Sequence, residues 1–120
     1  MKKILLIDDS IFFHAAITEI LNMQGFEVLL AEDGTTGIKL AQEQRPDLIL
    51  CDMTMPDLSG YEVLSALRHT PPTENIPFIF VTGNTEVQDV KSDAKLAADY
   101  LMKPFTLNEL VTLVSSRVTP

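Results

Sequence analysis

The sequence has little cysteine, few basic residues and no long apolar run, and each shortage excludes a class of protein. One cysteine, Cys51, stands among the 120 residues, so no disulfide can form within the chain, as is usual in a reducing compartment. Nine Lys and Arg face 17 Asp and Glu, and no basic cluster is available for nucleic acid or anionic membranes. No apolar run approaches the roughly 20 residues of a membrane span, and the one near the N-terminus is too short for a signal peptide. We therefore expect a soluble cytoplasmic protein.

The chain alternates short apolar runs with longer amphipathic stretches. The apolar runs predict buried strands at residues 4–7, 26–31, 47–51, 77–81 and 100–102. The amphipathic stretches predict helices at residues 11–24, 35–44, 60–68, 85–96 and 107–117. Strands that each lead into a helix favour an α/β fold, with one parallel sheet covered by helices on both faces. The length fits one domain over residues 1–120.

Polar side chains stand at the ends of four predicted strands. Asp8 and Asp9 follow the first strand, Asp52 the third, Thr82 the fourth and Lys103 the fifth. Ligands of open parallel sheets bind beyond the carboxyl ends of the strands, so we expect these groups to converge if the first and third strands are neighbours. Clustered carboxylates repel one another unless a cation compensates, and oxygen ligands suit Mg²⁺. With an ammonium and a hydroxyl beside them, such acids are typical of phosphoryl transfer, in which a carboxylate can be the nucleophile.

Four segments, in order, resemble the motifs of the receiver domains of two-component response regulators, similar to the single-domain regulators of chemotaxis. They are "ILLIDDS", "PDLILCDMTMPDLSG", "PFIFVTG" and "DYLMKPF". The spacings agree as well: 43 residues separate Asp9 from Asp52, 30 separate Asp52 from Thr82, and 21 separate Thr82 from Lys103. The resemblance covers essentially the whole chain. It implies a flavodoxin-like (βα)5 three-layer sandwich whose five-stranded parallel sheet has the strand order 2-1-3-4-5.

The resemblance assigns a role to each residue at the predicted sheet edge. Asp52 matches the phosphoacceptor. Asp9 and its companion Asp8 match the metal-binding acids, and Thr54 matches the residue whose backbone carbonyl binds the metal. The implied cofactor is Mg²⁺, with Mn²⁺ as an alternative.

Four further positions match the family's phosphoryl-binding and switching residues. Lys103 matches the lysine that pairs with the phosphoryl oxygens, and Thr82 the hydroxyl that moves towards them. Tyr100 matches the switch aromatic that couples to Thr82. Pro104 matches the proline that usually follows a cis peptide bond, a geometry that is accessible before proline.

The resemblance also implies partners. A sensor histidine kinase or histidine phosphotransfer protein would supply the phosphoryl group, and a downstream effector protein or domain would read the result. The face formed by residues 85–96, 100–102 and 107–117 would change its partner affinity, and the monomer would dimerise there if it dimerises on phosphorylation. Direct binding of nucleic acid or membrane is not expected. The domain would catalyse only its own phosphotransfer and dephosphorylation.

Three other functions are open from the residues. An aspartate-nucleophile phosphatase of the haloacid-dehalogenase type would carry D-x-D-x-T after the first strand, where this chain has "DDSIF". A flavin binder of the same fold would need a phosphate-binding loop there, and "DDSIFFH" would repel a flavin phosphate. The third is a receiver-like interaction module that takes no phosphate.

Several residues also have ordinary structural interpretations. The pair Asp8–Asp9 could begin a helix, because Asp is a good N-cap. Asp57 is expected to be a loop residue, His14 and His69 to be solvated, and Cys51 to be an inert buried thiol. Phe12 and Phe13 are adjacent, so we expect one of the two rings to be exposed, where it is a candidate for partner contact.

Overall fold

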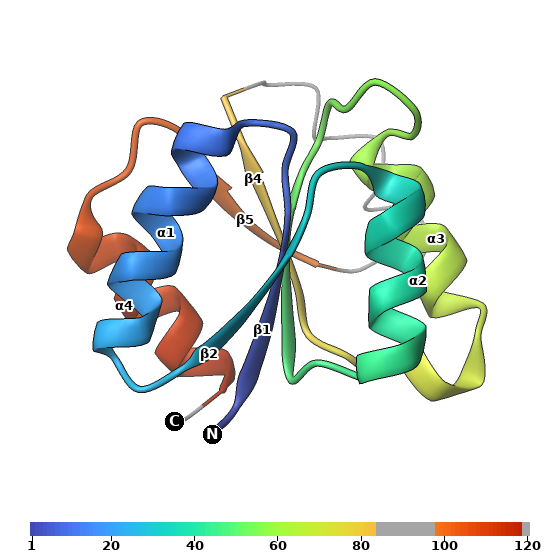
Figure 1. Cartoon of the computed structure of the whole chain (residues 1–120), viewed down its shortest axis with the longest axis horizontal. Helices are drawn as coiled ribbons and strands as arrows, with labels where there is room; N and C mark the ends of the chain where they lie inside the picture. Colours follow the sequence, from blue (N-terminus) through green and yellow to red (C-terminus); the bar gives the residue numbers. More distant parts are fainter. Residues whose placement is uncertain (84–97, 119–120) are drawn as a thin grey trace.

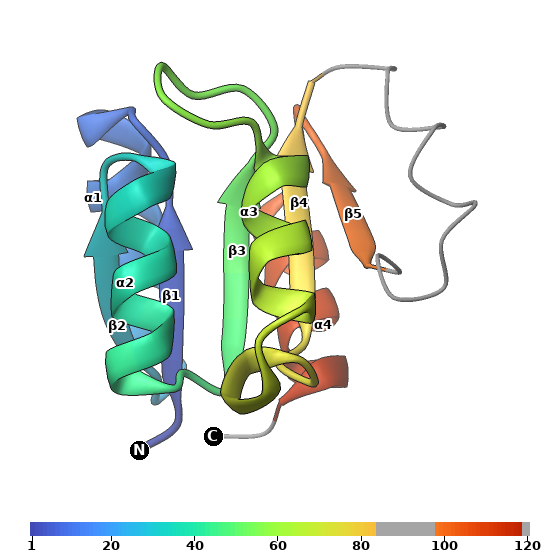
Figure 2. The same cartoon turned by 90° about the vertical axis from the view of Figure 1, so that its right-hand side faces the viewer.

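The five apolar runs form the strands of one parallel sheet in a computed structural model of the chain. The structure describes residues 1–83 and 98–118. The strands are β1 (Lys3–Ile7), β2 (Glu27–Ala31), β3 (Leu48–Asp52), β4 (Phe78–Thr82) and β5 (Asp99–Met102). Their order is β2-β1-β3-β4-β5, which confirms the expected topology (Figure 2). Asp52 and Thr82 are the last residues of their strands rather than the first beyond them, because their backbones still pair with the neighbouring strand.

The described helices begin where polar caps precede amphipathic stretches. They are α1 (Ile11–Met23), α2 (Gly34–Gln44), α3 (Gly60–Arg68) and α4 (Leu107–Arg117), with a short 3-10 turn, η1 (Pro71–Thr73), in the predicted loop before β4. Their N-caps accept backbone N–H groups that the first helical turn leaves unpaired, and are Ser10, Asp33, Ser59 and Thr106. The helix expected over residues 85–96 lies outside the described residues. None of the described helices is long and apolar enough to cross a membrane.

The central strands β1, β3 and β4 are buried on both faces, and each face of the sheet packs against two of the described helices (Figure 1). Leu5 and Ile7 of β1 belong to the apolar cluster that α2 and α3 cover. Ile4 and Leu6 point the other way, into the cluster that α1 and α4 cover. This follows from the alternation of side chains along a strand. Because the interior of the sheet is filled with apolar side chains, its polar groups are left at the strand ends.

Gly60 lies where α3 passes closest to the end of β3, and it leaves no room for a side chain. Its amide donates to the carbonyl of Met53 at 2.8 Å. A Cβ at this position would lie 2.5 Å from the backbone carbonyl oxygen of Asp52 and 2.9 Å from the Phe80 ring. The first of these contacts is with the main chain, so a side-chain rotation cannot relieve it.

We expect Gly60→Ala to destabilise the protein by about 1–3 kcal/mol, because the added methyl overpacks the junction between β3 and α3. Urea unfolding followed by circular dichroism measures this change. Gly83→Ala is the matched control, since among the described residues its added Cβ would meet nothing closer than the Lys103 Cβ at 3.8 Å. Equal unfolding midpoints for the two variants would contradict the packing argument.

Candidate functional site

Three carboxylates meet at the carboxyl edge of the sheet, where β1 and β3 lie side by side. Ile7 pairs with Cys51 across these strands, so the residues that follow them, Asp8 and Asp52, reach the edge together. One carboxylate oxygen from each of Asp8, Asp9 and Asp52 lies within 4.8 Å of the other two. The predicted convergence of the three acids is therefore confirmed.

Asp8 is buried at the base of this cluster, with 1% of its surface exposed. Its Oδ1 accepts the backbone N–H of Ser10 at 2.8 Å. Its Oδ2 is also buried and has no hydrogen-bond partner among the described residues. An unpaired buried carboxylate oxygen is costly, and a cation beside it would remove that cost. The N-cap of α1 is Ser10, so Asp8 and Asp9 precede the helix and do not cap it. Together with Asp52 they fit a small divalent cation such as Mg²⁺.

Asp52 lies half-buried at the end of β3, and its surroundings disfavour its charge. Burial raises the pKa of its carboxyl group, and the negative charge of Asp8 raises it further. Lys103 and the backbone N–H groups of Thr54 and Met53 act in the opposite direction without cancelling the rise in pKa. The ionised form of Asp52 would gain from further positive charge at this edge.

Thr82 and Lys103 lie at the ends of the two strands next in order: Thr82 is the last residue of β4, and Lys103 follows β5. Thr82 is buried at the end of β4, one residue beyond Val81, which pairs with Asp52. The amide of Lys103 donates to the carbonyl of Thr82 at 2.8 Å. The ammonium of Lys103 lies 4.5 Å from the centre of the Phe13 ring. Thr82 and Lys103 thus stand on the same side of the acidic cluster.

Tyr100 and Pro104 flank this lysine along the chain. The Tyr100 ring stacks on Phe80, with 5.4 Å between centroids and 21° between planes, and burial raises the pKa of its hydroxyl. Tyr100 is therefore part of the packing between β4 and β5. The peptide bond between Lys103 and Pro104 is cis.

The structure overturns one expectation and supports three others. His14 is not solvated: it is 5% exposed, because it lies on the buried stripe of α1 with Ile17 and Leu21. His69 is exposed, as expected. The Cys51 thiol is fully buried, and burial beside acidic groups raises its pKa well above the usual range, so it stays protonated and unreactive. One of the two adjacent phenylalanine rings is exposed, as expected: Phe12 is 88% exposed, and Phe13 is half-buried.

Asp57 has a structural role that sequence reasoning missed. It lies in the loop between β3 and α3, as expected, but its carboxylate reaches the start of α2. It accepts the amide of Gly34 at 3.0 Å, the amide of Thr35 at 2.9 Å and the hydroxyl of Thr35 at 2.7 Å. The contact ties the loop that carries Thr54 to a neighbouring helix. No local pattern reveals it, because the partners are 22 and 23 residues apart.

These hydrogen bonds hold the pKa of Asp57 well below its ordinary range. A carboxyl whose folded-state pKa is depressed stabilises the fold above its unfolded pKa of about 4, and that contribution is lost as pH falls towards the folded value. We therefore expect Asp57→Asn to lower the unfolding temperature near neutral pH, and the difference from wild type to narrow below about pH 4.

Thermal unfolding of both proteins over a pH series measures this difference. Glu43→Gln is the control, since the side chain of Glu43 is exposed on α2 and forms no hydrogen bond within the described part of the chain. A difference that is the same at every pH, or that is absent at neutral pH, would show that ionised Asp57 does not stabilise the loop.

Comparison with known proteins identifies the family to which this fold and acidic edge belong. Residues 4–115 match the family model described as "Response regulator receiver domain". The chain therefore belongs to the response regulator receiver domains, which are signalling modules of two-component systems rather than enzymes. Membership implies a histidine kinase as partner, and the cluster of Asp8, Asp9 and Asp52 is typical of the family's phosphoacceptor site. This result decides against the phosphatase and the flavin binder.

Named relatives agree with this assignment. The "DNA-binding response regulator MtrA" of Mycobacterium tuberculosis is 34% identical over 118 residues, which are 98% of this chain and 50% of that protein. The chain thus spans about half the length of the curated relatives it matches. Chemotaxis protein CheY4 of Vibrio cholerae has a TM-score of 0.89 and 29% identity, over 98% of this chain and 99% of that one.

A further solved structure bears on the metal. The receiver domain of the sensor histidine kinase PA1611 of Pseudomonas aeruginosa has a TM-score of 0.85 and 30% identity, over 97% of this chain and 96% of that one. It holds a magnesium ion coordinated in its active-site cleft. A receiver relative therefore binds Mg²⁺, and this chain has an acidic triad that fits the same ion.

Proposed function

We propose that this chain takes a phosphoryl group onto Asp52 from a phosphohistidine of a sensor histidine kinase or histidine phosphotransfer protein. One observation carries the proposal: three carboxylate oxygens lie within 4.8 Å of one another at the edge where Thr82 ends β4 and Lys103 follows β5. Asp52 suits the acceptor role better than Asp8, whose carboxylate is buried and bonded to Ser10. The proposal takes residues 1–120 as one receiver domain that acts in the cytoplasm with its kinase.

The proposed step is an in-line transfer between two nucleophiles. An oxygen of Asp52 forms a bond to phosphorus while the phosphorus–nitrogen bond to the donor histidine breaks and its electron pair returns to the imidazole. Asp8, Asp9, Asp52 and the backbone carbonyl of Thr54 would hold Mg²⁺, which supplies positive charge for the phosphoryl oxygens.

The lysine and the threonine complete the proposed site. The Lys103 ammonium pairs with one phosphoryl oxygen of the aspartyl-phosphate, and the Thr82 hydroxyl donates to another. Hydrolysis of the acyl phosphate in the same site, by water attack on phosphorus, returns Asp52 to its carboxylate form. Pro104 follows Lys103 through the cis bond described above.

Exposed apolar side chains beside the site suit the docking of the phosphohistidine protein. Ile11 is 68% exposed and Phe12 is 88% exposed, and both follow directly after Ser10, whose amide binds Asp8. A donor that brings its histidine to Asp52 would cover this first turn of α1. We therefore propose that the exposed Phe12 ring contacts the phosphohistidine protein.

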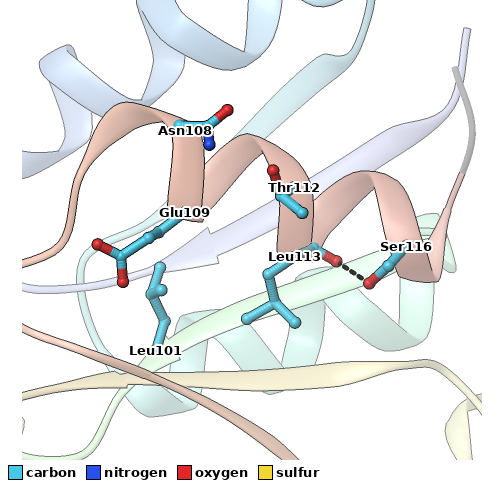
Figure 3. A pocket seen from close by; sticks show the side chains of 6 residues that line it. All are labelled: Leu101, Asn108, Glu109, Thr112, Leu113 and Ser116. Atoms are coloured by element: carbon cyan, nitrogen blue, oxygen red, sulfur yellow. Dashed lines mark hydrogen bonds between the residues drawn. The ribbon is translucent and has the colours of Figure 1, made fainter.

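We place the output on the face of β5 and α4. On phosphorylation Thr82 moves towards the phosphoryl group and Tyr100 follows, and the effector reads the new surface. Arg117 of α4 is joined to Asp99 of β5, with its Nη2 2.8 Å from Oδ1, so the two elements share one surface. A hollow of about 400 Å³ opens there (Figure 3), lined by Leu101, Asn108, Glu109, Thr112, Leu113 and Ser116.

The remaining part of the expected output face, residues 85–96, lies outside the described residues. We propose that the unphosphorylated protein is a monomer and that any dimer formed on phosphorylation uses the surface of β5 and α4.

Incubation with Mg²⁺ and acetyl phosphate tests the proposed acceptor directly. We expect intact-protein mass spectrometry to show one adduct of about 80 Da on the wild type, and none on Asp52→Asn. Asp33→Asn is the matched control, because Asn also serves as an N-cap and Asp33 lies outside the acidic cluster. No adduct on the wild type, or an equal adduct on Asp52→Asn, would overturn the proposal. The first result would favour the interaction module that takes no phosphate.

A further inference from the structure

The ammonium of Lys103 rests on an aromatic ring rather than on an acid. Its Nζ lies 4.5 Å from the centroid of the Phe13 ring, which belongs to α1. Phe105, two residues after Lys103, packs edge-on against the same ring, with 6.1 Å between centroids and 85° between planes. Among residues 1–83 and 98–118 the structure shows no ion pair between Lys103 and any of the three acids. The Phe13 ring, against which Phe105 packs, thus provides a place for the ammonium beside the site.

A cation over the face of an aromatic ring is attracted by the negative face of its quadrupole, and the attraction falls off within about 6 Å of the centroid. An exposed ion pair between one lysine and one carboxylate has a similar, small strength in water. The ring can therefore compete with Asp52 for the ammonium when Asp52 carries a single charge. A phosphorylated Asp52 carries more negative charge and three acceptor oxygens, so the Lys103 ammonium should then favour the phosphoryl group over the Phe13 ring.

We propose that Phe13 is a positioning residue that holds the Lys103 ammonium away from Asp52 before phosphorylation and releases it to the phosphoryl group afterwards. This inference rests on the proposed function. It adds that Phe13 influences the affinity of the site for a phosphoryl group. Because Lys103 must leave the ring to reach its ligand, the ring weakens the binding of a phosphoryl group at Asp52. Replacing the ring by an apolar side chain without a π face should strengthen that binding.

The contact itself can be measured without any phosphoryl donor. Protons above a ring face are shielded, so the Lys103 ε-methylene signals of the wild type should lie upfield of those of other lysines in an NMR spectrum. In Phe13→Leu, which keeps an apolar side chain, these signals should return to the ordinary position. Unshifted signals in the wild type would overturn the inference.

The functional consequence can be measured with beryllium fluoride and Mg²⁺, which form a stable mimic of an aspartyl-phosphate. We expect Phe13→Leu to bind the mimic about two- to fivefold more tightly than the wild type, and Phe13→Trp to bind it more weakly, since Trp attracts cations most strongly. A role in packing alone would not order the three side chains in this way. In a Lys103→Gln background the identity of residue 13 should no longer change the affinity.

The outcomes separate this inference from the proposed function. If the wild type binds the mimic but Phe13→Leu binds it equally well or more weakly, or if the effect of residue 13 persists without Lys103, the inference is wrong and the proposed function stands. If the wild type does not bind the mimic, the proposed function is overturned and the inference falls with it. Thermal unfolding of each variant confirms that the affinities compared are those of folded protein.

Discussion

The repulsion among three carboxylates at one edge of the sheet is the interaction around which the rest of this molecule is arranged. Asp8, Asp9 and Asp52 present oxygens within 4.8 Å of one another, and one oxygen of the buried Asp8 has no partner among the described residues. Like charges at this separation destabilise a folded chain unless a cation lies among them. The packing of the domain holds the acids together, and a divalent cation bound among them would make the arrangement favourable.

The packing that holds them is apolar and lies on both sides of the strands. Ile4 and Leu6 contribute to one cluster and Leu5 and Ile7 to the other, so β1 cannot move without disturbing two cores. The loop after β3 is held in a different way, through hydrogen bonds from the start of α2 to Asp57. The apolar packing thus lies below the edge of the sheet, and the polar side chains of the proposed site lie at that edge.

Much of the fold could be predicted from the sequence, because the central strands β1, β3 and β4 are buried on both faces and appear as short apolar runs. Acids that end such runs must lie at the sheet edge, so the sequence alone places Asp8, Asp9 and Asp52 there. The prediction that His14 is solvated is wrong, because His14 shares the buried stripe of α1 with Ile17 and Leu21. Contacts between distant segments could not be predicted, because no local sequence pattern indicates them. Examples are the hydrogen bonds of Asp57 to the start of α2 and the contact of the Lys103 ammonium with the Phe13 ring of α1.

Thermal unfolding of wild type and Asp52→Asn, with and without Mg²⁺ near neutral pH, tests most directly whether this edge is a repulsive cluster that needs a cation. Because its surroundings raise the pKa of Asp52, its charge destabilises the metal-free fold. The account predicts that without Mg²⁺ the Asn variant unfolds at the higher temperature. Saturating Mg²⁺ should then raise the Tm of the wild type and remove or reverse that difference. A metal-free variant less stable than wild type, or a wild-type Tm that Mg²⁺ leaves unchanged, would contradict the account.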